Sequence, residues 1–218
     1  MNLILLLLTV SSAFSQQSEP QKKTVGVQGI YQIADEAYEI LKSRHNITGR
    51  IVIVDFSRPS EEERLFVYDT STDSMLFQAL VAHGKNTGDR FAKHFSNTHN
   101  SNQSSLGFYR ISEQYHGKYG LSYRLDGLEP KYNDNARDRA VVIHPAWYVS
   151  EAMIAKHGRL GRSFGCPALS KKDYKKFTEL VKPGSLLFVY FPDEKYFQES
   201  AVIRQLEGLD HLFASLEL

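Results

Sequence analysis

The sequence predicts a mainly β domain with flanking helices packed on its outside. Its strand signals are short runs rich in Val, Ile, Phe and Tyr, each bounded by polar turn residues. Aromatic residues are plentiful, with 13 Phe and 12 Tyr in the chain, and such side chains favour strands. Helical spacing of apolar residues also occurs, most clearly near the start of the predicted domain.

The first 15 residues have the features of a secretory signal peptide. Residues 3–10 form an apolar run that is too short to span a bilayer. Ala13, Phe14 and Ser15 then fit the small-x-small pattern of a cleavage site. The segment before the run has no Lys or Arg, which leaves an N-terminal membrane anchor as the alternative. We expect residues 1–15 to be removed during export.

The rest of the chain is long enough for one domain with a sizeable core. Residues 16–28 are polar and predict a linker, and residues 29–218 predict the domain. The net charge is +1, from 26 basic and 25 acidic residues, so electrostatics predict no nucleic-acid partner. We expect an exported protein of the periplasm or cell envelope, with no stable membrane partner after cleavage of the signal peptide.

The domain is expected to open with a helix and three strands. In residues 30–44, apolar side chains recur at helical spacing and predict an amphipathic helix. Residues 50–56, 64–70 and 75–84 are apolar runs separated by short polar turns, which predicts three consecutive strands.

A long polar loop, residues 85–105, follows the third strand. Loops of this length in a compact domain are usually functional or disordered. Residues 106–112 and 120–127 predict two further strands. A charged loop at residues 133–139 then leads into residues 140–144, whose apolar run predicts a buried strand.

The last third of the chain predicts two helices, one strand and a final helix near the C-terminus. The helices are expected at residues 147–156 and 170–181. Ser170 is placed to cap the second of them, with Asp173 three residues on. The apolar run of residues 185–191 predicts the last core strand.

The stretch GRSFGCPAL, residues 161–169, holds the only cysteine of the chain, Cys166. Exported proteins usually pair their cysteines or lack them, so a single one is either buried and inert or kept for its reactivity. Gly161, Gly165 and Pro167 indicate a turn, and turns lie on protein surfaces. The sequence therefore favours a reactive thiol.

A histidine is the expected partner of that thiol. The ordinary thiol pKa is about 8.5, and a histidine within hydrogen-bond reach can provide a thiolate below it. His144 ends an apolar strand, whereas His157 ends a helix before Gly158. A strand fixes its terminal side chain better than a fraying helix end does, so His144 is the better candidate; a satisfied core histidine is the alternative.

These residues and several other stretches resemble the L,D-transpeptidase family. His144 at a strand end, followed by RSFGC, is similar to the family's signature of a histidine and a later Ser/Thr-His-Gly-Cys. The stretches VAHGKNTG, SSLGFYRI, HGKYGLSYRLDGLE, NDNARDRAVVIH and GRSFGCPA resemble, in this order, the YkuD-like branch called the murein L,D-transpeptidase catalytic domain. The resemblance covers residues 51–191 and implies a single L,D-transpeptidase-like β-sandwich catalytic domain.

The resemblance implies a cysteine acyltransferase acting on peptidoglycan stem peptides. Cys166 would be the nucleophile, His144 the general base, and the Pro145 carbonyl the group that orients it. The amides of Phe164, Gly165 and Cys166 would stabilise the oxyanion. An amine acceptor would give a 3–3 cross-link (L,D-transpeptidase), and water would give an L,D-carboxypeptidase. No cofactor, neither metal nor organic, is implied.

Further residues are candidates for substrate binding. Ser163 would position the cysteine turn, and Arg162 would hold a stem carboxylate. Tyr123 and Arg124 would line the donor side of the cleft, and His83 would lie beside it. An ordinary structural or solvated role is the alternative for each of them.

The sequence is also compatible with two other hypotheses about function. Phe164 stands where the family signature has a histidine, so the chain could be a non-catalytic cell-wall-binding domain. His83, His94 and His99 could serve a metal-dependent murein peptidase, although no tight ligand spacing such as H-E-x-x-H is present.

Overall fold

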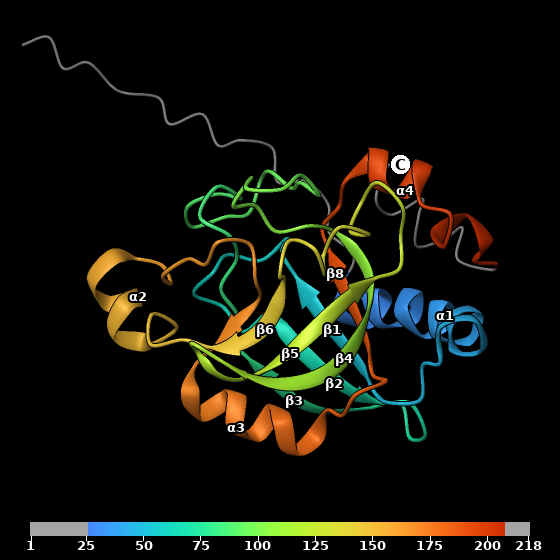
Figure 1. Ribbon diagram of the computed structural model, residues 1–218, viewed down its shortest axis with the longest axis horizontal. Coiled ribbons are helices and arrows are strands. Elements are labelled where there is room, and N and C mark those ends of the chain that lie inside the picture. The colour runs from blue at the N-terminus through green and yellow to red at the C-terminus, as the bar shows by residue number, and fades with distance from the viewer. Residues whose placement is uncertain (1–25, 208–218) are drawn as a thin grey trace, which may run out of the picture.

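A computed structural model describes residues 26–207 of the chain (Figure 1). The expected signal peptide and most of the expected linker lie outside these residues. Within them, eight strands form one mixed sheet in the order β3-β2-β1-β8-β4-β5-β6-β7. The strands are β1 (Ile51–Asp55), β2 (Leu65–Asp69), β3 (Ser74–Ala79), β4 (Gly107–Gly117), β5 (Gly120–Gly127), β6 (Val142–Pro145), β7 (Ala168–Leu169) and β8 (Leu186–Tyr190).

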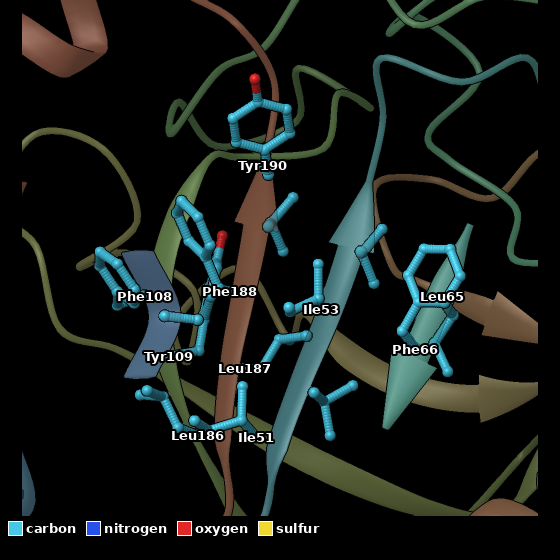
Figure 2. Close-up of a cluster of buried hydrophobic side chains, with 14 of the residues drawn as sticks. Ile51, Ile53, Leu65, Phe66, Phe108, Tyr109, Leu186, Leu187, Phe188 and Tyr190 are labelled. Carbon is cyan, nitrogen blue, oxygen red and sulfur yellow. The ribbon is translucent and has the colours of Figure 1, made fainter. Parts of the chain in front are cut away.

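The centre of the sheet is buried on both faces. All residues of β1 and β8, which pair in parallel, are buried, as expected for strands with continuous apolar runs. Figure 2 shows side chains of β1, β8, β4 and β2 packed together in this core. The rings of Phe108 and Phe188 stack there with their centroids 4.3 Å apart.

The sheet is twisted, and β4 and β5 run obliquely to β1, β2 and β3 in Figure 1. One core cluster contains side chains from both parts of the sheet, among them Phe66 of β2 and Tyr123 of β5. The prediction of a mainly β domain with flanking helices is confirmed.

Helix α1 (Val27–His45) covers part of this core. Its buried face includes Ile30, Ile33 and Leu41, and it packs against β1 and β8. Asn46, in the left-handed conformation with a φ of 52°, ends the helix. The helix begins three residues before the predicted start and takes in Val27, which the sequence placed in the linker.

The two helices that flank the cysteine turn, here residues 163–168, are capped by serine side chains. Helix α2 (Glu151–His157) begins after Ser150, whose hydroxyl accepts from the Met153 amide. Helix α3 (Lys171–Leu180) begins after Ser170, whose hydroxyl accepts from the Asp173 amide, so the predicted cap is confirmed. Residues 147–150, predicted as helix, form a turn instead.

The C-terminal part of the described chain adds two short helices. These are α4 (Glu194–Glu199) and the 3₁₀ helix η1 (Ile203–Gln205). None of the helices in residues 26–207 is long and apolar enough to cross a membrane.

Three strands differ from the prediction by more than one residue at an end. Strand β3 ends at Ala79, because residues 80–84 leave β2 and form isolated bridges to the cysteine turn instead. Strand β4 runs on to Gly117 and forms a long hairpin with β5. Strand β6 starts at Val142, because Ala140 has a φ of 54°, which no strand residue adopts.

Candidate active site

The cysteine turn is held by two hydrogen bonds of one serine hydroxyl. Ser163 Oγ accepts from the Gly165 amide at 3.0 Å and donates to the Cys166 carbonyl at 2.6 Å. The backbone of Ser163 also bonds to that of His83 and Lys85, which ties the turn to the chain after β3. Ser163 thus has the contacts expected of a residue that positions the turn.

Gly165 is required by the shape of this turn. Its φ is +127°, a conformation that side-chain-bearing residues rarely adopt. A β-carbon at this position would also lie 2.8 Å from the Gln103 carbonyl oxygen. The loop of residues 85–105 therefore packs directly against the cysteine turn.

The Cys166 side chain is half-buried at the wall of a cavity of about 480 Å³. Its Sγ lies 3.8 Å from the Ala140 carbonyl oxygen, which is within reach of the weak thiol hydrogen bond. The other walls come from the β4–β5 hairpin, the segment before β6 and the 85–105 loop. Residues of these walls include Lys118, Tyr119, Arg139, Val142, Asn102 and Phe164.

Burial raises the pKa of the Cys166 thiol, while a hydrogen bond from the Val142 backbone and the charges of Arg139 and Lys118 lower it. The net direction is upward. This upward direction runs against the expected thiolate below the ordinary thiol pKa, because low-dielectric surroundings disfavour the charged form.

His144 lies on the strand next to the cysteine turn. Strands β6 and β7 pair in parallel and place His144 opposite Ala168, two residues after Cys166. The ring is almost fully buried, and Tyr119 stacks on it with ring centroids 4.4 Å apart. The phenol ring and the strand together fix the orientation of the imidazole.

The tautomer of His144 follows from its hydrogen bond. Nδ1 lies 3.0 Å from the Pro145 carbonyl oxygen, which only accepts, so Nδ1 carries the proton and Nε2 is a base. Burial lowers the pKa of His144, and the charge of Lys118 lowers it further, whereas the hydrogen bond to Pro145 raises it. The net direction is below the ordinary value. Both directions favour a neutral thiol and a neutral imidazole at neutral pH.

One of the three expected oxyanion donors is already occupied. The Gly165 amide donates to Ser163 Oγ, so it is not available to a substrate oxygen. The amides of Phe164 and Cys166 donate to no other residue in the described range 26–207. These two groups are the remaining donors at the turn.

Phe164 is the most exposed residue of the turn, with 65% of its surface accessible. Its ring borders the cavity beside Cys166, and the ammonium group of Lys85 lies 4.5 Å from the ring centroid. The position where the family signature has a histidine is thus an apolar, cation-capped wall of the cleft.

Arg162 and His83 hold the base of the loop. Arg162 Nη1 donates to the carbonyls of Lys85 and Gly88 at 3.2 and 2.9 Å. His83 is buried, accepts from the Arg64 guanidinium at 2.8 Å and donates to the Gly88 carbonyl at 3.3 Å. Both residues lie next to the turn, yet neither lines the cavity at Cys166.

Tyr123 and Arg124 lie on β5, away from the cavity wall. Tyr123 has no exposed surface, and its hydroxyl donates to the Val181 carbonyl at 2.7 Å. Arg124 pairs with Glu113 and lies over the ring of Tyr115. A bound peptide cannot touch the Tyr123 side chain in this position, so the expected substrate-binding role of Tyr123 does not fit the structure.

The structure also brings to the cavity three residues that were not singled out from the sequence: Arg139, Lys118 and Tyr119. Lys118 and Tyr119 lie at the tip of the β4–β5 hairpin, a segment that was not predicted as strand. Within residues 26–207, no group of three His, Cys, Asp or Glu side chains could hold a metal ion.

A family model described as the L,D-transpeptidase catalytic domain matches residues 19–190. The chain belongs to this family. The predicted family is thereby confirmed.

Solved L,D-transpeptidases resemble the chain at low sequence identity. One from Mycobacterium smegmatis is 12% identical with a TM-score of 0.42, and the match covers 65% of this chain and 58% of that one. One from Stackebrandtia nassauensis is 18% identical with a TM-score of 0.41, and the match covers 72% and 65% of the two chains. The chain thus spans less than two thirds of either one. The comparison with curated proteins gave no match.

Proposed function

We propose that this L,D-transpeptidase domain is a cysteine acyltransferase that acts on peptidoglycan stem peptides. The observation that carries the proposal is the placement of Cys166. Its thiol borders a cavity of about 480 Å³, on a glycine turn beside the strand that holds His144. The family supplies the substrate class, a murein tetrapeptide stem.

The reaction begins with a proton transfer. His144 Nε2 takes the thiol proton of Cys166 as the sulfur attacks the carbonyl of the third stem residue. Because both groups are neutral at rest, this transfer accompanies the attack and is general base catalysis. The Pro145 carbonyl, bonded to Nδ1, stabilises the imidazolium that forms.

The tetrahedral intermediate carries its negative charge on the former carbonyl oxygen. The amides of Phe164 and Cys166 are the donors available to it, since Ser163 occupies the Gly165 amide. Collapse breaks the peptide bond, D-Ala leaves with the proton from His144, and a thioester to Cys166 remains. An amine of a second stem then takes the acyl group, or water does so and releases a tripeptide.

The cavity fits an extended peptide better than a free amino acid. Its walls come from four segments far apart in sequence, and they are mostly apolar, with Lys118 and Arg139 as cations. Aromatic rings of Tyr119 and Phe164 stand on two of these walls. Such a site would bury the stem around the scissile carbonyl while leaving both ends of the peptide accessible.

The proposal includes export of the protein to the periplasm or cell envelope, where murein lies. It rests on the signal-peptide features of residues 1–15, which lie outside the described range. N-terminal sequencing of the native protein should give a start near Gln16, and a start at Met1 would contradict export by cleavage.

Incubation with purified muropeptides tests the reaction class. Mass spectrometry should show loss of D-Ala from tetrapeptide stems and either a new cross-link or a tripeptide. The Cys166→Ala protein should give neither product, and a chelator should leave the wild-type products unchanged. Binding of murein without any product would favour the wall-binding alternative, and loss of activity with a chelator would favour a metal-dependent peptidase.

A further inference from the structure

The guanidinium of Arg139 is a half-buried cation that lacks a carboxylate partner among residues 26–207. It is held instead by four neutral acceptors of the 85–105 loop. Nη1 donates to the Ser96 carbonyl at 2.8 Å and to Ser105 Oγ at 3.2 Å. Nη2 donates to Ser101 Oγ at 3.3 Å and to the Gln103 carbonyl at 2.6 Å. A guanidinium keeps its charge in such a site, so this positive charge has no counter-charge bonded to it among the described residues.

The same loop segment supports the cysteine turn. Ser104 Oγ donates to the Gly165 carbonyl at 3.1 Å, and the Gln103 carbonyl packs against Gly165. Arg139 Nη2 lies 3.5 Å from where a β-carbon of Gly165 would be. The guanidinium therefore lies beside Gly165, which precedes Cys166. The side chains of Arg139 and Cys166 border the same cavity.

The backbone after Arg139 also reaches the thiol. Ala140 has a φ of 54° and is held there by turn hydrogen bonds from its own amide and from that of Val141. This turn directs the Ala140 carbonyl toward the Cys166 thiol, whose Sγ is 3.8 Å away. The Arg139 guanidinium thus lies beside Gly165, and the Ala140 carbonyl lies beside the sulfur of Cys166.

We propose that Arg139 is the fixed cation that stabilises the Cys166 thiolate as it forms, and that its loop contacts hold it in that place. It is a positioning residue: the proton of the thiol still goes to His144, and Arg139 exchanges none. The inference concerns the nucleophile and rests on the proposed function only in assigning Cys166 that role.

Among residues 26–207, the charge of Lys118 and the phenol of Tyr148 also interact with Cys166, and His144 lies on the strand next to the cysteine turn. Lys118 is at the hairpin tip, where its ammonium lies over the Tyr119 ring, and solvent at such a tip screens charge. The pKa of Tyr148 is raised by burial, so its phenol stays neutral at physiological pH. The charges of Arg139 and Lys118 lower the pKa of Cys166 against the effect of burial, in the direction the proposal requires.

The single cysteine allows a direct test, because alkylation reports on Cys166 alone. The rate of reaction with iodoacetamide is measured against pH for the wild type, Arg139→Gln and Arg137→Gln. Arg137 is the matched control, two residues away and paired with Glu113 and Asp126 at the surface. The pH midpoint of the alkylation rate should be higher in Arg139→Gln than in the wild type, by about one pH unit or more. Arg137→Gln should keep the wild-type midpoint.

A second measurement covers the case in which Arg139→Gln does not fold. The rates of Cys166 alkylation by anionic iodoacetate and by neutral iodoacetamide are measured for the wild type and for Lys118→Gln. The ratio of the two rates in each protein is compared with the ratio for a small thiol. A fixed cation beside the sulfur should favour iodoacetate in both proteins. The proposal is overturned if the Arg139→Gln midpoint does not move, if Arg137→Gln moves it equally, or if Lys118→Gln alone abolishes the iodoacetate preference. Neither readout uses murein, so a chain inactive on muropeptides can still pass or fail this test.

Discussion

The carbonyl oxygen of Gln103 lies 2.8 Å from the point where a β-carbon on Gly165 would sit. The contact joins the middle of the 85–105 loop to the residue before the cysteine. Together with the positive φ of Gly165, it explains why glycine is needed there. The position of the thiol thus depends on a loop about sixty residues upstream.

Gly165→Ala should lower both stability and acylation of Cys166. The substitution combines a strained φ of +127° with a backbone clash, and strain of this kind costs about 1–3 kcal/mol. Gly120→Ala is the control, because Gly120 has a φ of +91° but nothing lies within 4 Å of its β-carbon position. Urea unfolding should show the larger loss for Gly165→Ala; an equal loss for both variants would mean that the loop contact is unimportant.

His144→Ala should lose about 10² to 10⁴ in the rate at which a muropeptide donor acylates Cys166, the usual contribution of a general base. His157→Ala should acylate at nearly the wild-type rate, because His157 is exposed at the end of α2, before Gly158. Stopped reactions analysed by mass spectrometry measure both rates. If His157→Ala failed to acylate Cys166 while His144→Ala acylated it normally, His144 would not be the general base.

The buried histidine of the loop base should make the fold acid-sensitive. Burial, followed by the charge of Arg64, lowers the pKa of His83 to about 3. In the unfolded chain the value is about 6.5. Below that pH the unfolded state takes up a proton that the folded state refuses, so stability falls as the pH drops from about 6.5 toward 3.

His83→Gln removes this proton uptake. Between pH 7 and pH 5, the wild type should lose about 2 kcal/mol more of its unfolding free energy than the variant does. Urea unfolding at the two pH values measures the difference. Identical pH dependence in the two proteins would show that His83 titrates normally and is not buried against Arg64.

Much of the fold could be predicted because the central strands carry their signal locally. Strands β1, β2 and β8 are apolar runs between polar turns, and Ser170 with Asp173 marks the start of α3. Strand β7 has two residues and exists because of its pairing with β6, so no periodicity could reveal it. The tip of the β4–β5 hairpin is polar and glycine-rich, so its sequence did not predict the end of β4. This part of the hairpin places Tyr119 on His144.

The site was predictable where the motif is contiguous and not where it is assembled by tertiary contacts. The cysteine turn, His144 and the Pro145 carbonyl come from short stretches of sequence. Arg139 is one of several charges in a polar segment, and only its bonds to a distant loop distinguish it. The raised pKa of Cys166 depends on burial, which the turn residues alone did not indicate. Tyr123 sits next to a charged residue in sequence, yet its side chain points into the core.

In the proposed reaction, Cys166 carries the acyl group between donor and acceptor. Intact-mass spectrometry of the protein, quenched in acid during reaction with a tetrapeptide muropeptide, tests it most directly. The wild type should show one adduct equal to the donor minus D-Ala, mapped by proteolysis to Cys166, while Cys166→Ala shows none. Release of D-Ala by Cys166→Ala, or turnover by the wild type with the adduct on another residue, would show that Cys166 is not the nucleophile.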